Sequence, residues 1–563
     1  MPEATRRLKD PIAQEDGSQV THSVATPVGF TVRGAVYLGS TKVIPVIFVP
    51  GTMGTHLRLR RDTGLPEDHP LEPGAVAWRP PNSDPEAFQY ANDWNKRSPR
   101  ERQLILHPQF VEVDNGGELR VGSCNLRPDE MRQRGWGEIH HGAYGELLHE
   151  LQSHLEMTFR VDALRQRHVR KRWIEVMQAV AEDPQGRWGV RAVEPLTERE
   201  LETFSGYQYP VYACGYNWLQ SCGDSACRLE RRIDEILAWW RARKHECRQV
   251  ILVTHSMGGL VARACAKRIP EKIAGIVHGV MPALGAPLMY RRLACGTECD
   301  SPTNNAYGNF VAGKFADLAG RRPEDTTPVL AAAPGALELL PNHLYPRPWL
   351  HIAVARPARH RNMDQATDYL QLPNESQPNP YAIYRDMDAW YRLINPALLD
   401  PAGLYASRQD AVRTAKQALD SAEHFHAWLA DHYHAASFAW YGDDPAYASY
   451  GRIRWVARLP AGLSATAANI RHARFMAHEP DGARIVEVDG KRILSFAVEP
   501  QDAHGDDTVA RQSGAAPEGK VRKLFATRGV RHQDGYRHRN ALLLTHYSIV
   551  KIVKELTKHG RRQ

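Results

Sequence analysis

The feature that most constrains the fold of this chain is an apolar segment that leads through a tight turn into a helix. Residues 249–254, QVILVT, form a short β-branched run that predicts a buried strand. The motif His255-Ser256-Met257-Gly258-Gly259 follows at once, and residues 260–268 are typical of a helix. A serine between a strand and a helix, with a glycine two places on, predicts a sharp turn that lifts the hydroxyl out of the sheet.

Other strand and helix patterns alternate around this turn. Buried strands are predicted at 43–50, 209–214, 274–281 and 437–441, with strand character again at 484–498. Helical spacing of apolar residues is found at 143–156, 226–243, 408–430 and 540–557. This alternation is typical of an α/β protein with a mostly parallel central sheet and helices on both faces. Together with the serine turn it predicts the α/β-hydrolase fold.

The domain organisation follows from the length of 563 residues, which exceeds the roughly 100–200 residues of an ordinary domain. We expect an N-terminal arm at 1–40 and one catalytic domain at 41–563, with the excess length in insertions. The first insertion, at about 55–145, is polar and rich in Pro, Arg and Asp, which predicts a surface segment. The second, at about 288–435, is expected to lie over the carboxyl edge of the sheet, and the two would form a lid or cap.

The charge of the chain and its N-terminal residues indicate where the protein is made and which partners it can bind. The first twenty residues are charged and contain no apolar core of signal-peptide length. No run approaches the roughly 18 apolar residues of a membrane span. We therefore expect synthesis in the cytoplasm, with export by a route that needs no cleaved signal left open. The net charge of +8 favours anionic surfaces, but no nucleic-acid motif accompanies it, so we predict no nucleic-acid partner.

Ser256 is the candidate nucleophile for attack on an ester carbonyl. Its hydroxyl is weak at neutral pH and needs an aligned base, as well as N–H donors for the oxyanion that develops. One donor is predicted to be the backbone N–H of Met257, at a helix N-terminus. The other is predicted in the turn after strand 43–50, between Gly51 and Gly54, with Thr52 preferred over Met53.

The acid and the base are expected late in the chain, because this fold orders them serine, acid, histidine. Asp506 and Asp507 are the candidate acids on a turn after a strand-like stretch, and Asp443 and Asp444 compete by their place after strand 437–441. His532 is the candidate base because it precedes the closing helix. His538 and His546 are its rivals, although the position of His546 within a helix favours a packing role.

Metal and redox chemistry have weak support, so we predict no required cofactor and no metal site. Calcium is the one ion left open, through two pairs of carboxylates: Asp386 with Asp388, and Asp443 with Asp444. The close cysteine pairs would be thiols in the cytosol and could close small loops in an oxidising compartment. They are Cys222 with Cys227, and Cys295 with Cys299.

Several motifs resemble the lecithin–cholesterol acyltransferase and lysosomal phospholipase family. The segment 49–57, VPGTMGTHL, is similar to its oxyanion segment. The turn Gly215-Tyr216-Asn217-Trp218 is similar to its Tyr-Asp-Trp turn, with Asn217 where Asp is usual. Residues 255–259 and 505–510 resemble its nucleophile and acid motifs. The resemblance therefore implies that Ser256 is the nucleophile and that Asp506, rather than Asp507, is the acid.

A bacterial group is more similar still. The segments 134–138, RGWGE, 144–145 and 215–263 resemble the lipase effectors of type VI secretion, which hydrolyse membrane phospholipids of rival bacteria. Residues 529–536 resemble their catalytic-histidine segment, which implies His532. The resemblance further implies delivery to the periplasm of target cells, a secretion-spike component as carrier, and a cognate immunity protein in the producing cell.

The sequence thus predicts a serine esterase or lipase that hydrolyses carboxylic esters of membrane phospholipids by a Ser256–His532–Asp506 triad. The resemblance implies that it acts as an antibacterial effector of type VI secretion. Two alternatives stay open. One is a housekeeping intracellular esterase or an acyltransferase, which would share the same turn. The other is a binding protein of hydrolase fold without catalysis.

Overall fold

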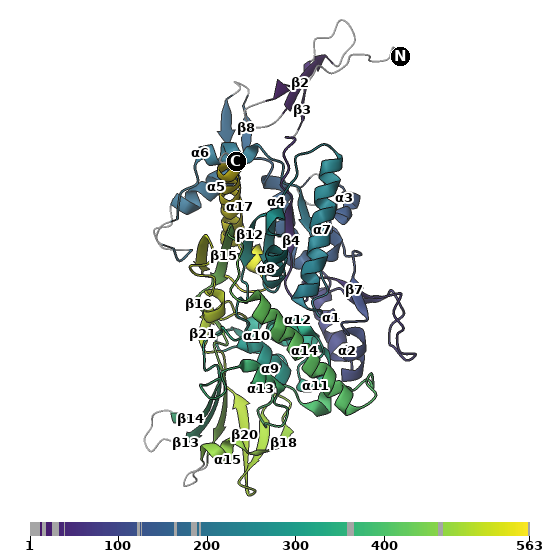
Figure 1. Ribbon diagram of the computed structural model, residues 1–563, viewed down its shortest axis with the longest axis vertical. Helices are drawn as coiled ribbons and strands as arrows, with labels where there is room; N and C mark the ends of the chain where they lie inside the picture. The colour runs from purple at the N-terminus through teal and green to yellow at the C-terminus, as the bar shows by residue number, and fades with distance from the viewer. Residues whose placement is uncertain are drawn as a thin grey trace.

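A six-stranded parallel sheet lies at the centre of the computed structural model (Figure 1). Each neighbouring pair of strands runs parallel, so all six strands end at the same edge. In spatial order they are β10 (Val211–Ala213), β4 (Val46–Val49), β11 (Val250–His255), β12 (Ile273–Gly279), β15 (Ser437–Gly442) and β22 (Lys523–Thr527). This arrangement confirms the predicted α/β class and parallel sheet.

The described part of the chain covers residues 12–13, 19–24, 33–38 and 40–560, apart from 121–123, 125, 163–165, 182–187, 191–192, 357–364 and 460–465. Within these residues no helix is both long enough and apolar enough to pass through a lipid bilayer. The prediction of an N-terminal arm falls largely outside them. Three short antiparallel strands are placed there: β1 (Ile12–Ala13), β2 (Gln19–Val24) and β3 (Arg33–Leu38).

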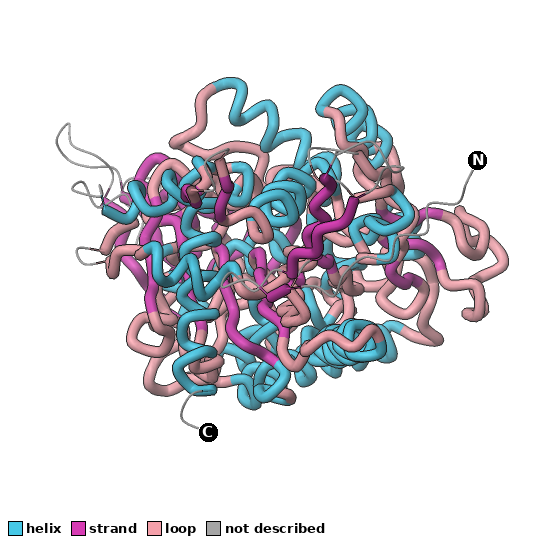
Figure 2. The backbone as a smooth tube through the Cα atoms, turned by 90° about the horizontal axis from the view of Figure 1, so that it is seen from above, coloured by secondary structure: helices cyan, strands magenta, loops and turns pink. Residues whose placement is uncertain are grey.

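Both faces of the sheet are covered by helices, as the view from above shows (Figure 2). In β4, Ile47 and Val49 join the apolar cluster that contains residues of α7 (Cys222–Ala242) and α8 (Gly258–Arg268). Val46 and Phe48 alternate with them and join the cluster of α4 (His141–His154) and α17 (Arg539–Gly560). Because successive side chains of a strand point to opposite faces, a strand covered on both faces must be apolar throughout.

The first insertion is more deeply packed than its polar composition predicts. Trp78 and Trp94 are at most 1% exposed and belong to the same core cluster as α7 and α8. The prediction of an insertion at the surface stays a prediction, but these two tryptophans anchor the segment to the core. The sequence did not reveal this anchoring, because a few widely spaced tryptophans bury much area without giving a periodic pattern. Its elements are β5 (Leu57–Leu59), β6 (Val76–Trp78), α1 (Asp84–Asn95), α2 (Pro99–Ile105), β7 (Val111–Val113) and α3 (Pro128–Gln133).

The second insertion lies beyond the carboxyl ends of the central strands (Figure 1). It is mostly helical, with one β-hairpin between its helices. Its elements are α9 (Pro287–Cys295), α10 (Ala306–Ala319), α11 (Pro323–Leu330), α12 (Pro334–Leu337), β13 (Leu350–Arg356), β14 (Gln365–Leu372), α13 (Pro380–Arg385), η3 (Pro396–Leu398) and α14 (Arg408–Leu429). Whether it acts as a lid stays a prediction.

A third excursion, not predicted from the sequence, leaves the central sheet after β15 and returns before Asp506. Together with the hairpin of the second insertion it builds a mixed six-stranded sheet in the order β14, β13, β17, β20, β19, β18. The strands expected at 484–498 are therefore present, but they belong to this second sheet. The excursion comprises β16 (Asp444–Ser449), β17 (Ile453–Arg458), α15 (Ala467–Arg471), β18 (Arg474–His478), β19 (Arg484–Val488), β20 (Arg492–Val498) and β21 (Ala503–Gly505).

The remaining elements complete the hydrolase-like core. A hairpin and two helices connect α4 to β10, and a short helix precedes β22. They are β8 (Phe159–Val161), β9 (Arg167–Val169), α5 (Lys171–Ala181), α6 (Glu198–Ser205) and α16 (Arg511–Gly514). Single turns of 3₁₀ helix lie at Trp136–Glu138, Pro270–Lys272 and Gly535–Arg537.

Candidate active site

Ser256 occupies the predicted turn between β11 and α8. Its φ is +51°, a left-handed backbone conformation that non-glycine residues rarely adopt. The Ser256 N–H donates to the carbonyl of Gly279 at 2.9 Å, which ties the turn to the end of the neighbouring strand β12. Such strain persists only where the surroundings enforce it and is typical of functional sites.

The close approach of helix α8 to the end of strand β4 explains why a glycine, Gly258, stands two places after the serine. A Cβ at Gly258 would lie 2.4 Å from the carbonyl oxygens of both Val49 and Pro50, so only glycine lets α8 start beside the end of β4. Thr254, two places before the serine, is fully buried, and its hydroxyl lies 3.2 Å from His278 Nδ1. That hydrogen bond satisfies the polar group which threonine adds at this position.

His532 lies between Ser256 and Asp506. Its Nε2 is 2.8 Å from Ser256 Oγ, and its Nδ1 is 2.9 Å from Asp506 Oδ2. Asp506 Oδ1 accepts the N–H groups of Thr508 and Val509 at 3.1 and 2.6 Å, which fixes the carboxylate. Since a carboxylate only accepts, Nδ1 carries the ring proton and Nε2 is free to accept from the serine hydroxyl.

The competing acids take other partners. Asp507 lies next to Asp506 but faces Arg531, 3.6 Å away, and its pKa is raised to about 7 by burial and by the charge of Asp506. Asp444 Oδ2 accepts the N–H of Gly529 at 2.7 Å, at the start of the loop that carries His532. Asp443 lies 3.5 Å from His504.

The competing histidines lie outside this constellation. His538 Nδ1 accepts the N–H of Asn540 at 3.3 Å, in the first turn of α17. His546 lies within the same helix, where its Nδ1 donates to the carbonyl of Leu542 at 2.8 Å. Burial lowers the pKa of His546 to about 4, so its ring packs as a neutral group.

The backbone N–H groups predicted to bind the oxyanion are not engaged elsewhere among the residues that the structure describes. Within the described part of the chain, the N–H groups of Thr52 and Met257 have no hydrogen-bond partner. The turn that holds Thr52 is closed by the Gly54 N–H, which donates to Gly51 at 3.1 Å, and Met53 has a φ of +61°. The N–H of Met53 is equally free in the same residues, so the order of Thr52 and Met53 stays a prediction.

A buried relay that sequence reasoning missed joins this turn to His532. The Gly51 N–H donates to the Tyr144 hydroxyl at 3.2 Å, and that hydroxyl lies 3.0 Å from His255 Nδ1. His255 Nε2 lies 2.8 Å from the His532 carbonyl, which can only accept. Nε2 therefore carries the proton, Nδ1 accepts from Tyr144, and the ring is neutral because burial lowers the pKa of His255 to about 3.

The signal for the relay was partly visible in the sequence. Tyr144 and His255 both lie in segments that resemble the secreted lipases, but nothing in the sequence pairs residues 111 positions apart. The relay gives His532 a fixed backbone position through its carbonyl, while the N–H of His532 donates to the Asp506 carbonyl at 2.8 Å. Both sides of the histidine loop are thereby anchored.

The constellation is covered in this conformation. Ser256 and His532 are each about 5% exposed, and Asp506 is 1% exposed. A low-dielectric site of this kind strengthens the hydrogen bonds inside it. It also means that a bulky ester reaches the serine only after covering residues have moved.

The candidate calcium carboxylates serve other contacts. Asp386 Oδ1 accepts the N–H groups of Asp388 and Ala389, each at 3.0 Å. Among the residues that the structure describes, no group of three or more His, Cys, Asp or Glu side chains is placed to hold a metal ion. All eight cysteines are free thiols, including the two close pairs noted in the sequence.

Comparison with known proteins agrees with this architecture. Residues 220–299, which include the serine turn, match a PGAP1-like alpha/beta domain. A solved structure of the Tle4–Tli4 complex contains a chain that is 28% identical in sequence, with a TM-score of 0.70. The match covers 91% of this chain and 98% of that one. No curated protein sequence matches the chain.

The fold and the serine turn define a protein of the α/β-hydrolase class. Within that class the chain is similar to Tle4 over nearly its whole length. The match to Tle4 and the PGAP1-like match confirm the fold and the resemblance predicted from the sequence.

Proposed function

We propose that this protein is a serine lipase that hydrolyses carboxylic ester bonds of membrane phospholipids. The observation that carries the proposal is the unbroken hydrogen-bonded series from Ser256 Oγ through His532 to Asp506, at 2.8 and 2.9 Å. A nucleophile, a base and an orienting carboxylate within this reach are the parts that acyl transfer requires.

In the proposed mechanism, Ser256 Oγ attacks the ester carbonyl while His532 Nε2 takes the hydroxyl proton. Asp506 stabilises the imidazolium that forms and holds the ring with its Nδ1 proton inward. The N–H groups of Met257 and Thr52 donate to the oxyanion of the tetrahedral intermediate. His532 then protonates the leaving alcohol, and water releases the acyl group by the same steps in reverse.

The substrate class is proposed from the likeness of this chain to known lipases. The chain resembles lipase effectors of type VI secretion, and its net charge of +8 favours an anionic lipid surface. We propose delivery by such a system to the periplasm of target cells. Since Tle4 was solved together with Tli4, we also propose a cognate immunity protein as partner.

A fluorophosphonate probe tests the nucleophile directly, because it reacts covalently with an activated serine. We expect labelling of the wild-type chain, none of Ser256→Ala, and unchanged labelling of the control Ser376→Ala, which alters an exposed serine. An unlabelled wild type would favour a binding protein of hydrolase fold, and a labelled Ser256→Ala would place the nucleophile elsewhere.

Expression in bacteria with and without a periplasmic leader tests the effector role. We expect growth arrest and loss of membrane phospholipid only with the leader, and neither with Ser256→Ala. Labelled but harmless protein in the periplasm would instead support a housekeeping esterase. Transfer of the acyl group to an added alcohol in preference to water would support an acyltransferase.

A further inference from the structure

The first insertion contacts residues 51–54, hereafter the oxyanion turn, through the side chain of Trp78. Strand β6 pairs with β5 so that Trp78 lies opposite Leu57, shortly after the turn ends. From there the indole Nε1 donates to the carbonyl of Met53 at 2.8 Å. Trp78 is buried, at 1% exposure, so water does not compete easily for this carbonyl.

Met53 is the residue of the oxyanion turn that most needs such support. Its φ of +61° is a left-handed conformation that costs free energy in a residue with a side chain and persists only where neighbours enforce it. The peptide after Met53 is held at both ends, because its carbonyl accepts from Trp78 and its N–H, that of Gly54, donates to Gly51 at 3.1 Å. The hydrogen bond from Trp78 therefore fixes the plane of this peptide.

The other contacts of the oxyanion turn leave two N–H groups free. The Gly51 N–H belongs to the buried relay, and the Gly54 carbonyl accepts the N–H of His140 at 2.9 Å. Among the described residues, the N–H groups of the turn without a partner are those of Thr52 and Met53. These two groups are the candidate oxyanion donors, so whatever holds the turn also sets their direction.

Two neighbouring tryptophans share the packing of Trp78 but not its hydrogen bond. Trp94 and Trp218 lie edge-on against Trp78, with ring centroids 5.4 and 5.7 Å away. Both are buried. Within the part of the chain that the structure describes, Trp218 Nε1 has no hydrogen-bond partner and Trp94 Nε1 makes no bond to the backbone. Of the three packed indoles, Trp78 is thus the one that bonds to the oxyanion turn.

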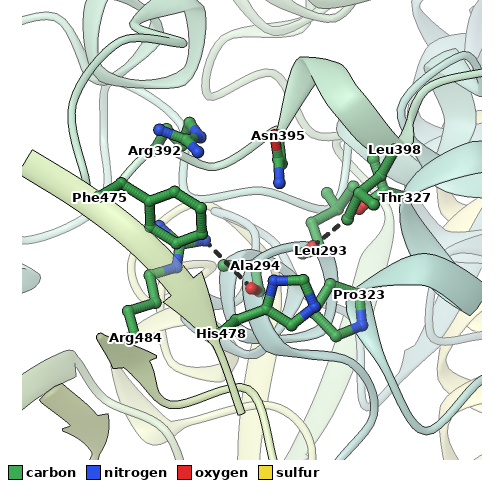
Figure 3. A pocket seen from close by; sticks show the side chains of 10 residues that line it. All are labelled: Leu293, Ala294, Pro323, Thr327, Arg392, Asn395, Leu398, Phe475, His478 and Arg484. Carbon is green, nitrogen blue, oxygen red and sulfur yellow. Dashed lines mark hydrogen bonds between the residues drawn. The ribbon is translucent and has the colours of Figure 1, made fainter. Parts of the chain in front are cut away.

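The second insertion is fastened elsewhere. Figure 3 shows Arg484 of β19 reaching across to α9, where its guanidinium donates to the carbonyl of Ala294 at 3.1 Å. The ring of Phe475, on β18, lies 4.3 Å from the guanidinium of Arg392. These contacts join the second insertion to the second sheet and involve no residue of the oxyanion turn. A change at Trp78 therefore tests the hold of the first insertion.

We propose that Trp78 is a positioning residue for ester hydrolysis, whose indole N–H holds the Met53 peptide so that the free N–H groups of the turn face the oxyanion. The inference rests on the proposed function, because the direction of these groups matters only if Ser256 attacks an ester carbonyl. Trp78 acts through the turn and not on the substrate. Oxyanion donors work by being preorganised, and a displacement of about 1 Å can cost about a hundredfold in rate.

Trp78→Phe removes the N–H, and Trp94→Phe is the matched control because it makes the same change in the same cluster. We expect Trp78→Phe to lower kcat on a short-chain ester about ten- to a hundredfold. KM should change little, because the lost stabilisation belongs to the transition state. The affinity for a trifluoromethyl ketone, which forms a tetrahedral adduct with the serine, should fall with kcat. Trp94→Phe should leave both at the wild-type value.

The pH dependence of kcat separates the turn from the histidine. Because the hydrogen bond of Trp78 is to the oxyanion turn rather than to the loop of His532, the pH of half-maximal kcat should not change in Trp78→Phe. A fall in kcat that comes with a shifted pH dependence would assign the effect to His532 and overturn the inference.

A second variant separates the hydrogen bond from the packing. In 3-benzothienylalanine, sulfur takes the place of the indole N–H and the shape is kept, so this residue at position 78 should lower kcat as Trp78→Phe does. Wild-type kcat in this variant, or equal effects of Trp78→Phe and Trp94→Phe, overturns the inference while the proposed function stands. A wild type that neither cleaves esters nor reacts with the fluorophosphonate probe overturns both.

Discussion

Replacing Tyr144 by phenylalanine tests whether the buried relay positions the candidate site. The hydroxyl is the only part removed, and it contacts two groups, the Gly51 N–H at 3.2 Å and His255 Nδ1 at 3.0 Å. The Tyr144 side chain is buried, at 2% exposure, so water does not reach these groups easily.

The size of the effect follows from the two partners left behind. An unsatisfied buried donor or acceptor costs about 1–3 kcal/mol, so we expect Tyr144→Phe to lower the free energy of unfolding by about 2–4 kcal/mol in total. Gly51 precedes Thr52, and the His255 ring holds the His532 carbonyl. A displaced oxyanion turn and histidine loop should therefore lower kcat on a short-chain ester, by up to about a hundredfold.

Urea denaturation and ester hydrolysis measure the two quantities, with Tyr209→Phe as the matched control. The Tyr209 hydroxyl is equally buried and donates only to the Phe204 carbonyl at 2.7 Å, away from the site. Its loss should cost about 1 kcal/mol and leave kcat unchanged. If Tyr144→Phe behaves like Tyr209→Phe in both measurements, the relay does not position the site.

Other substitutions give separate expectations. Asp506→Asn should lower kcat by about 10⁴-fold through the wrong histidine tautomer, whereas Asp507→Asn should keep most activity in the same ester assay. Gly258→Ala should cost about 1–3 kcal/mol in urea denaturation, because its Cβ would meet two carbonyls at 2.4 Å. Burial raises the pKa of Glu338 to about 7, so this residue stabilises the fold at acidic pH, and its contribution is lost as the pH rises toward 7. The full difference is about 3 kcal/mol, and Glu338→Gln should remove that slope in urea midpoints measured between pH 4.5 and 8.

The central architecture could be predicted because its signals are local. The apolar run of β11 and the serine turn are continuous in sequence, and the strand is buried on both faces. Asp506 could be chosen over Asp507 from a short motif, and the hydrogen bond of Asp506 to His532 agrees with that choice. Neighbouring residues carry all of this information.

The second sheet could not be predicted because its pairings are distant. Strand β13 lies parallel to β17 with Leu350 opposite Ile453. The hydrophobic pattern of each strand does not indicate which residue of a strand about a hundred positions away it will pair with. The strand pattern at 484–498 was visible, but its partners were not. The relay of Tyr144 and His255 was missed for the same reason, since it depends on side chains brought together only by folding.

The coverage of Ser256 has a kinetic consequence for any ester that this protein cleaves. Since Ser256 is only about 5% exposed, a bulky ester reacts only with molecules that have rearranged, and the observed rate is the intrinsic rate multiplied by their fraction. The free energy of that rearrangement adds to the activation barrier, about 1.4 kcal/mol for every tenfold decrease in rate. A surface that favours the rearranged form would then accelerate hydrolysis without altering a single group that performs the chemistry.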